Sequence, residues 1–227
     1  LSWRESIARV EVVPLDSEGH LDIGVLEKLL RQHAGGPLLI GSFSAASNVT
    51  GIRTDVERVT RLLKQYDALS FWDYAAAAPY VRIRMNGGAD TSGISSEQTR
   101  VEVGGRVDPN ASGDLPEIAD TDSNRSIPKD AVFISPHKFI GGPGTPGLLI
   151  VKKSVMQNRV PAVPGGGTVS YVSPAGHRFL SDPQRREEGG TPDIVGAVRA
   201  GLVFKLQQEV GAENIERIEQ QHIRYAL

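Results

Sequence analysis

Short apolar β runs alternate with amphipathic helical segments in this sequence, and this alternation constrains the fold more than any other feature. Strands are predicted at residues 10–13, 38–40 and 68–72. Between them lie two helices with apolar residues at helical spacing, one capped by Asp22 and one opened by a capping box of Thr54 and Glu57. Strands that alternate with helices predict an α/β fold with a mostly parallel central sheet and helices on both faces.

The second half of the sequence continues this pattern. Strands are predicted at residues 148–151 and 169–172, and a half-exposed final helix at residues 212–227. Before that final helix, another is predicted to begin with Thr191 as N-cap and Pro192 at its first position, and to end at Gly211. We expect its buried side to carry the apolar residues Ile194, Val195, Val198, Leu202, Val203 and Leu206.

The composition is that of an ordinary globular protein. The 227 residues are 39% apolar with a formal net charge of −2, which allows one large core and gives no reason to expect nucleic acid or an anionic membrane as a partner. No apolar run approaches the length of a membrane span. Because the chain has no cysteine, it has no disulfide, no thiolate metal site and no residue that carries a persulfide. No metal site is predicted.

Two charged residues stand where predicted strands end. Asp73 follows the strand at 68–72, and Lys138 follows the run Phe133-Ile134-Ser135-Pro136-His137. Ligands of parallel α/β sheets bind off the carboxyl ends of the strands. A desolvated lysine amine at such a place is a nucleophile that can form a Schiff base. The local sequence alone leaves an exposed loop lysine as an equal alternative.

The glycines after Lys138 imitate a nucleotide-binding motif. Residues 142–147 match the spacing G-x-G-x-x-G, but the dinucleotide motif needs a strand before it and a helix after it. Two prolines interrupt the run here and a β run follows, so no helix N-terminus is available for a pyrophosphate. NAD binding is therefore not predicted. The P-loop pattern fails as well, because the lysine precedes the glycines.

Three motifs occur in a characteristic order: Asp73, the run Ser135-Pro136-His137-Lys138-Phe139, and the run Glu188-Gly189-Gly190-Thr191-Pro192. Together they resemble the class V aminotransferase-like family of pyridoxal 5′-phosphate (PLP) enzymes, the group that holds cysteine desulfurases and selenocysteine lyases. The resemblance implies that residues 1–227 are the PLP-binding large domain of a fold type I PLP-dependent transferase. It also implies that an N-terminal part and a small C-terminal domain are missing from this chain.

The resemblance assigns the chemical roles to three residues. Lys138 forms the Schiff base with PLP and then serves as general acid and base at the substrate α-carbon. Asp73 pairs with the pyridine nitrogen, which keeps the ring an electron acceptor. Ala75 packs on the ring face. The alternative for Asp73 is an aspartate that caps the next helix.

Four further residues are implied to bind the cofactor. Ser135 and His137 donate to its phosphate, although a core histidine bonded to the backbone is the alternative for His137. Asn48, in a Ser-Asn-x-x-Gly turn, reaches the cofactor hydroxyl or the substrate, or is an ordinary turn asparagine. Thr191 reaches the phosphate of the neighbouring subunit, which implies a homodimer, and the same residue suits plain helix capping.

The prediction is therefore a PLP-dependent enzyme that acts on an amino acid and is cysteine desulfurase-like or selenocysteine lyase-like, in the cytoplasm. Alternatives are an aminotransferase, an epimerase or a β-lyase on the same scaffold, and a non-catalytic relative that binds through an inserted loop. Two departures from the family keep these alternatives open. Ala76 stands where many relatives carry Gln or His beside the ring hydroxyl. Residues 87–130 are polar, contain no aromatic residue and are expected to be a surface insertion.

Overall fold

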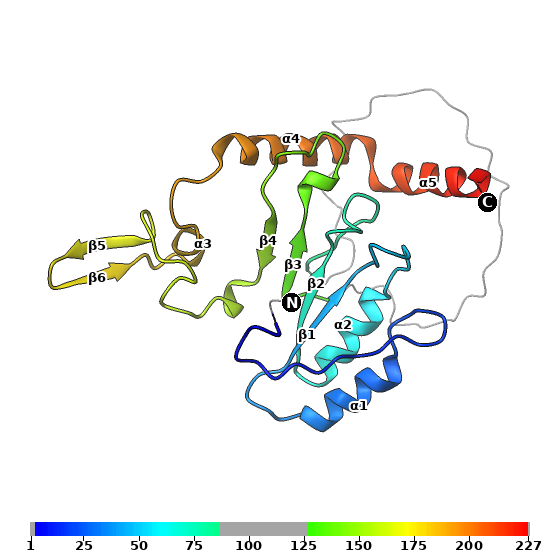
Figure 1. The fold of residues 1–227 in the computed structure, drawn as a ribbon, viewed down its shortest axis with the longest axis horizontal. Helices are drawn as coiled ribbons and strands as arrows, with labels where there is room; N and C mark the ends of the chain where they lie inside the picture. Colours follow the sequence, from blue (N-terminus) through cyan, green and yellow to red (C-terminus); the bar gives the residue numbers. More distant parts are fainter. Residues whose placement is uncertain (1–2, 87–126, 227) are drawn as a thin grey trace.

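The fold centres on a four-stranded sheet (Figure 1). The computed structural model describes residues 3–86 and 127–226. Its strands lie side by side in the order β1 (Ile40–Ser44), β2 (Leu69–Asp73), β3 (Ala131–Ile134) and β4 (Leu148–Val151). The first three strands are parallel and β4 is antiparallel to β3. The predicted α/β fold with a mostly parallel sheet is confirmed.

Helix α2 (Val56–Gln65) packs on β2 and carries much of the core. Its Val59 and Leu63 are fully buried in the same cluster as Trp72 of β2. The Trp72 indole nitrogen donates to the Thr60 hydroxyl at 3.0 Å, so the one polar atom of this large side chain is satisfied. Burial of apolar side chains of this size contributes about 1.5–3 kcal/mol each. This layer therefore holds β2 firmly in place.

The first elements of the chain follow the predictions in part. Helix α1 (Ile23–His33) begins as predicted, because the Asp22 carboxylate accepts a hydrogen bond from the Val25 amide at 2.9 Å. The strand predicted at residues 10–13 is wrong, since this segment pairs with no strand in the described part of the chain. Val12 is 63% exposed there. A run of β-branched residues favours a strand but forms one only where another strand is available to pair with it.

The capping box predicted for α2 is also wrong. Asp55 is the N-cap, and its carboxylate accepts from the Arg58 amide at 3.0 Å. Thr54 instead donates its hydroxyl hydrogen to the Ser44 carbonyl at 2.8 Å, which ties the start of α2 to the end of β1. The Glu57 carboxylate instead accepts a hydrogen bond from the ammonium of Lys129, a buried lysine far away in the sequence. A long-range partner thus replaces the local one.

The two stretches of chain on either side of residues 87–126 meet at one point. The Lys129 amide donates to the Met85 carbonyl at 2.9 Å. The Lys129 ammonium is buried and donates to Glu57 Oε1 at 2.7 Å, and the Ile127 amide donates to Glu57 Oε2 at 3.1 Å. Residues 87–126, most of the predicted insertion, lie outside the described residues. Their two flanks are therefore held together by the core and by α2.

We expect the protein to tolerate removal of residues 87–126, because the flanks already meet at a backbone hydrogen bond. A short glycine-serine linker in their place should raise the free energy of unfolding by about 2 kcal/mol or less, since loop-closure entropy changes by only about 0.6 kcal/mol for each halving of loop length. Chemical denaturation of the full-length protein measures this. Removal of residues 87–130 is the matched control and should prevent folding, because it also deletes the buried Lys129 and Asp130. Misfolding of the shorter deletion would contradict a surface insertion.

The C-terminal part extends beyond the sheet (Figure 1). Two short 3₁₀ turns, η2 (Pro136–Lys138) and η3 (Lys153–Val155), flank β4. A hairpin of β5 (Val169–Ser173) and β6 (Gly176–Phe179) comes next, followed by helices α3 (Pro183–Glu187), α4 (Ile194–Val210) and α5 (Ala212–Ala226). The predicted end of α4 is confirmed, since Gly211 is its C-cap with a positive φ of 81° that suits glycine.

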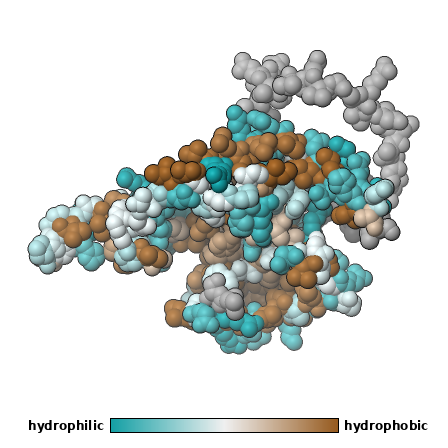
Figure 2. Space-filling model, turned by 45° about the horizontal axis from the view of Figure 1, so that its top comes forward, coloured by the Kyte–Doolittle hydropathy of each residue, from teal (hydrophilic) through white to brown (hydrophobic). Residues whose placement is uncertain are grey.

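The predicted buried side of α4 is largely wrong. Val203 is buried, and Phe204 meets Phe139 edge-on with 5.4 Å between ring centroids. Because α4 is apolar on all sides, its sequence carries no periodic signal for the side that faces the core. In the described part of the chain no helix, α4 included, has the length and hydropathy that a bilayer span requires. Figure 2 shows the apolar band along α4, whose exposed residues are Ile194, Val195, Val198, Leu202 and Leu206.

Candidate active site

The carboxyl ends of β1, β2 and β3 meet at one edge of the sheet (Figure 1). In the register of the sheet Ser44 pairs with Asp73, and Asp73 pairs with Phe133. The Tyr74 amide donates to the Phe133 carbonyl at 2.9 Å, which joins the segment after β2 to the end of β3. Asp73 and the residues after Phe133 therefore leave adjacent strands at the same edge, where α/β sheets bind their ligands.

Asp73 uses one carboxylate oxygen within the fold and keeps the other. Its Oδ1 accepts a hydrogen bond from the Ala75 amide at 2.7 Å, so the carboxylate shapes the turn after β2 and fixes Ala75 beside it. The side chain is exposed, and among the described residues Oδ2 has no hydrogen-bond partner. The alternative that Asp73 caps a following helix is wrong, because no helix begins between the end of β2 and residue 86, and Oδ1 closes a turn instead. The second oxygen is available to a ligand.

Tyr74 lies buried directly behind Asp73, and the sequence reasoning did not single it out. Burial raises the pKa of the Tyr74 phenol far above its usual value, and the nearby Glu57 carboxylate raises it further. The phenol therefore stays neutral at any physiological pH. The signal that could have revealed it is the Asp-Tyr pair that directly follows an apolar strand.

Lys138 ends the 3₁₀ turn η2, which starts directly after β3. The Lys138 amide donates to the Ser135 carbonyl at 3.0 Å. Lys138 and His137 are exposed and Ser135 is half-buried, so the alternative of a buried core histidine is wrong for His137. Among the described residues, the Lys138 ammonium, the His137 imidazole and the Ser135 hydroxyl have no hydrogen-bond partner. Three polar groups of one short turn are thus left for something outside the fold.

The turn after Lys138 is rigid for a reason that the sequence reasoning missed. A Cβ on Gly142 would lie 1.9 Å from the Pro136 carbonyl oxygen, so only glycine fits. The buried Thr145 hydroxyl donates to the Gly142 carbonyl at 2.7 Å. Phe139 is buried against α4. These contacts fix the backbone on both sides of Lys138, and the glycine-rich run that imitates a nucleotide motif is the signal for them.

Asn48 lies in the loop that follows β1, at the same sheet edge. The Ser47 hydroxyl accepts hydrogen bonds from the Val49 amide at 3.2 Å and from the Thr50 amide at 3.1 Å. This side chain-to-backbone turn presents Asn48 to solvent. The Asn48 side chain has no hydrogen-bond partner among the described residues. Its amide is therefore not needed to build the turn.

Thr191 does not cap α4, contrary to the prediction. Asp193 is the N-cap, and its carboxylate accepts from the Gly196 amide at 2.9 Å. The Thr191 hydroxyl is exposed and has no partner among the described residues. Val203 of α4 lies beside the turn that follows Lys138. Since a helix rises 1.5 Å per residue, about 14 Å of α4 separates its start near Thr191 from that turn.

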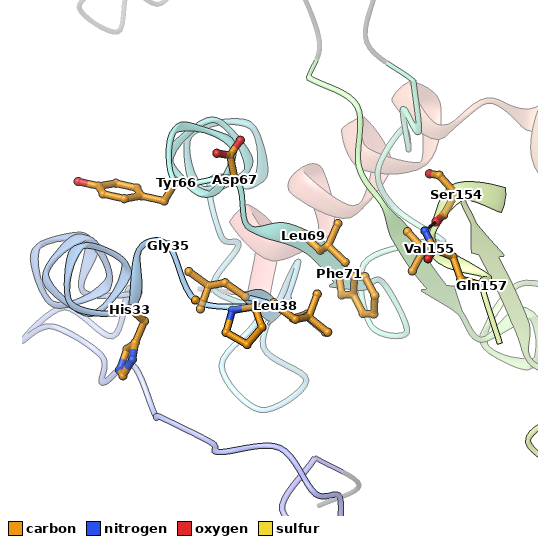
Figure 3. Close-up of a pocket in the computed structure, with 14 residues that line it drawn as sticks. His33, Gly35, Leu38, Tyr66, Asp67, Leu69, Phe71, Ser154, Val155 and Gln157 are labelled. Atoms are coloured by element: carbon orange, nitrogen blue, oxygen red, sulfur yellow. Dashed lines mark hydrogen bonds between the residues drawn. The ribbon is translucent and has the colours of Figure 1, made fainter.

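A pocket of about 700 Å³ lies elsewhere, at the amino ends of β1 and β2 (Figure 3). Leu38, Leu69 and Phe71 gather there between the end of α1 and the segment at Ser154 and Gln157. A strand of five residues is about 13 Å long, so the length of β2 separates this pocket from its carboxyl end. None of the predicted site residues lines it.

The sheet edge offers a defined set of chemical groups. It holds an exposed primary amine, a carboxylate oxygen, an imidazole and hydroxyls that are unsatisfied within the described fold. Such groups suit a ligand with an anionic group and an electrophilic carbon. Among the described residues, no three His, Asp or Glu side chains lie close enough together to hold a metal ion.

Several solved structures share the fold. The apo structure of cysteine desulfurase from Thermococcus onnurineus NA1 superimposes with a TM-score of 0.67 at 22% sequence identity, over 95% of this chain and 42% of that chain. The cysteine desulfurase CsdA from Escherichia coli gives a TM-score of 0.62 at 21% identity, over 93% of this chain and 42% of that chain. At these identities the likeness shows the fold alone.

Curated proteins show the same likeness in sequence. A probable cysteine desulfurase of Pyrococcus abyssi is 23% identical over 216 residues, which are 95% of this chain and 43% of that protein. A probable cysteine desulfurase of Chlamydia muridarum is 29% identical over 213 residues, which are 92% of this chain and 42% of that protein. This chain thus spans less than half the length of these relatives.

A sequence model of the family Aminotransferase class-V matches residues 3–97 and 124–227. The matched parts contain all three motifs on which the resemblance rests, and the unmatched residues 98–123 fall within the predicted insertion. The match covers most of the chain, with the strands and the sheet edge described above. The chain therefore belongs to the aminotransferase class-V family.

Proposed function

We propose that this chain is the larger part of the PLP-binding domain of a longer enzyme, which acts on an amino acid as a cysteine desulfurase does. Membership of the class-V family supports the type of enzyme, and the names of the similar proteins support the reaction. The observation that carries the proposal is the group of side chains around Lys138 and Asp73 that lack partners among the described residues. PLP has an aldehyde that suits the amine, a phosphate that suits the hydroxyls and the imidazole, and a ring nitrogen that suits the carboxylate.

The residues at the sheet edge fit the cofactor by their chemistry. Lys138 would supply the amine that holds the aldehyde carbon covalently. Ser135 and His137 supply a hydroxyl and an imidazole for the phosphate. Thr191 supplies a further hydroxyl. Because about 14 Å of helix separates the start of α4 from the turn after Lys138, we assign the Thr191 hydroxyl to the phosphate site of a second subunit in a homodimer.

The remaining residues orient the cofactor and move a proton. The free oxygen of Asp73 would pair with the ring nitrogen, and Ala75, whose amide is bonded to the other oxygen, would pack on the ring face. Asn48 reaches the ring hydroxyl or the substrate. When bound, PLP withdraws electrons from the substrate α-carbon. Lys138 takes the proton from that carbon and returns it, and the neutral Tyr74 adds no charge at this edge.

Two observations favour other reactions on the same scaffold. Ala76 follows Ala75 in the turn after β2, and an alanine offers no hydrogen bond to the ring hydroxyl. The chain also has no cysteine, so the thiol that receives sulfur in a desulfurase must come from outside these 227 residues. Transamination, epimerisation or β-elimination on the same scaffold needs no such thiol.

Incubation of the full-length protein with PLP, L-cysteine and a thiol reductant tests the proposed reaction. Alanine and sulfide in equal amounts are the expected products. A keto acid, a racemised amino acid or ammonia would instead establish one of those other reactions. Firm binding of PLP without turnover of any amino acid would contradict the enzyme proposal, and would favour a relative that only binds.

Replacing Asp73 with asparagine should lower kcat/KM for the amino acid about 10- to 100-fold, because the variant loses a charged partner for the ring nitrogen worth about 1.5–3 kcal/mol. Steady-state kinetics measures the effect. Asp67→Asn is the matched control, since Asp67 lies two residues before β2, at the opposite end of the strand from Asp73, and asparagine tolerates its φ of 54°. Equal kinetics for Asp73→Asn and the native protein would remove Asp73 from the site.

A further inference from the structure

We propose that Arg186 is a positioning residue that holds Thr191 in place for the phosphate of the neighbouring subunit's cofactor. This inference rests on the proposed function of Thr191. Arg186 lies in α3 and is only 6% exposed, whereas the adjacent Arg185 is exposed. A buried guanidinium is costly unless its hydrogens are bonded or its charge is paired. The contacts that compensate this cost therefore indicate what Arg186 does.

Arg186 joins α3 to the residues that follow the β5–β6 hairpin. Its Nη1 donates to the Leu180 carbonyl at 3.0 Å and to the Ser181 carbonyl at 3.2 Å. Both carbonyls lie between the end of β6 and the start of α3. A lysine has a single ammonium in place of the planar fork, so it reproduces these contacts only in part. The return from the hairpin thus depends on a guanidinium.

The neighbouring Glu187 extends this anchor to a second stretch of chain. Glu187 Oε2 accepts a hydrogen bond from the Ala162 amide at 2.9 Å, and Glu187 Oε1 lies 4.0 Å from Arg186 Nε. A carboxylate thus lies near the charge of Arg186, while the buried Arg186 Nε has no hydrogen-bond partner among the described residues. Glu187 holds the segment before β5 to the end of α3, and Arg186 holds the residues just before α3.

Backbone contacts of two glycines hold the other end of the segment. The Gly190 amide donates to the Gly166 carbonyl at 2.8 Å. A Cβ on Gly189 would lie 2.9 Å from the Val163 carbonyl oxygen, so this close approach needs glycine. Residues 187–190 are consequently fixed at both ends, by the contacts of Arg186 and Glu187 and by the glycine contact. Thr191 is the next residue, and its position follows from theirs.

This arrangement explains why a buried arginine stands five residues before an exposed threonine. The Thr191 hydroxyl is not needed for capping, because Asp193 caps α4. A hydroxyl that serves a phosphate must be placed to within about an ångström, since small displacements weaken positioned contacts strongly. Arg186 does not touch the phosphate in this scheme. It sets where Thr191 stands.

The first test compares binding of PLP with binding of pyridoxal, which lacks the phosphate, to the full-length protein by absorbance titration. Thr191→Ala and Arg186→Met should each weaken PLP binding about 10-fold, the effect of one lost charge-assisted hydrogen bond, and leave pyridoxal binding unchanged. The double variant should bind PLP no more weakly than Thr191→Ala alone, and Arg186→Lys should lie in between. Arg185→Met is the matched control and should bind both compounds as the native protein does.

Multiplied losses in the double variant would overturn the inference, as would equal weakening of PLP and pyridoxal by Arg186→Met. If Thr191→Ala binds PLP normally, both the inference and the proposed role of Thr191 fail. A second measurement needs no cofactor: hydrogen exchange of the Gly190 amide should be faster in Arg186→Met and Arg186→Lys, but not in Arg185→Met. Unchanged exchange would overturn the inference even if the protein binds no PLP, an outcome that separately refutes the proposed function.

Discussion

Replacing Lys138 with alanine should abolish the adduct that borohydride traps between PLP and the full-length protein. Lys138 is exposed at the carboxyl edge of the sheet, and its ammonium has no hydrogen-bond partner among the described residues. The backbone around it is rigid, because Gly142 packs on the Pro136 carbonyl and Phe139 is buried. Such a lysine is presented to a ligand without being engaged by the fold. Mass spectrometry of the reduced protein should find the cofactor on Lys138 alone.

Turnover should fall with the adduct. Removal of a general acid and base costs about 10²- to 10⁴-fold in rate, and the loss of covalent attachment adds to this. Lys153→Ala is the matched control, because Lys153 is also exposed and lies in a 3₁₀ turn after β4. A trapped adduct that persists in Lys138→Ala would refute the assignment of the lysine. If Lys153→Ala lost the adduct instead, the site would have to lie at the opposite end of the strands.

The fold was predictable because its signals are local and repeated. The apolar runs that became β1 and β2 alternate with the amphipathic segments that became α1 and α2, and such a pattern has few solutions other than a parallel α/β sheet. Strand ends shifted by a few residues, since pairing decides them: Leu38 was expected in a strand but is 66% exposed, and β1 begins at Ile40. Asp73 and Lys138 could be placed at one edge because parallel strands end together.

The failures have two physical causes. Local sequence does not show distant partners: Glu57 completes the pattern of a capping box but binds the buried Lys129, and Asp55 caps α2 instead. Local sequence also offers several capping residues close together: Thr191 was predicted as the N-cap of α4, yet the carboxylate of Asp193, two residues later, accepts the hydrogen bond from the Gly196 amide.

Asp130 illustrates how strong such contacts are. It lies just before β3 and is 4% exposed. Its carboxylate accepts hydrogen bonds from the Lys64 ammonium, from the Lys152 ammonium at 3.1 Å and from the Ser70 amide at 2.8 Å. Asp130→Ala would leave two ammonium groups and a buried amide without their acceptor. Removing one partner of a buried pair costs about 3–5 kcal/mol, and partial exposure of the two lysines places the expected loss near 3 kcal/mol.

The pH dependence of stability gives a second and independent check on Asp130. Burial by itself raises the pKa of Asp130, but hydrogen bonds from Lys64, Ser70 and Lys152 outweigh burial and lower the pKa below its usual value. A folded-state pKa below the unfolded value of about 3.9 means that the stabilisation is complete above that pH. It is lost as the pH falls through the lowered folded-state pKa. The native protein should therefore lose more stability on acidification than Asp130→Asn, which has no carboxylate to protonate at this position.

Denaturation of the full-length protein by urea, at pH 7 and then at pH 3 and below, measures both effects. Asp130→Ala should shift the midpoint strongly at pH 7, and the gap between Asp130→Asn and the native protein should narrow in acid. Glu18→Gln is the matched control, because the Glu18 side chain is 80% exposed and contributes little to stability. A constant gap at every pH would mean that the charge of Asp130 stabilises nothing. The anchor between α2, β2 and the end of β4 would then rest on packing and on neutral hydrogen bonds such as that from the Ser70 amide.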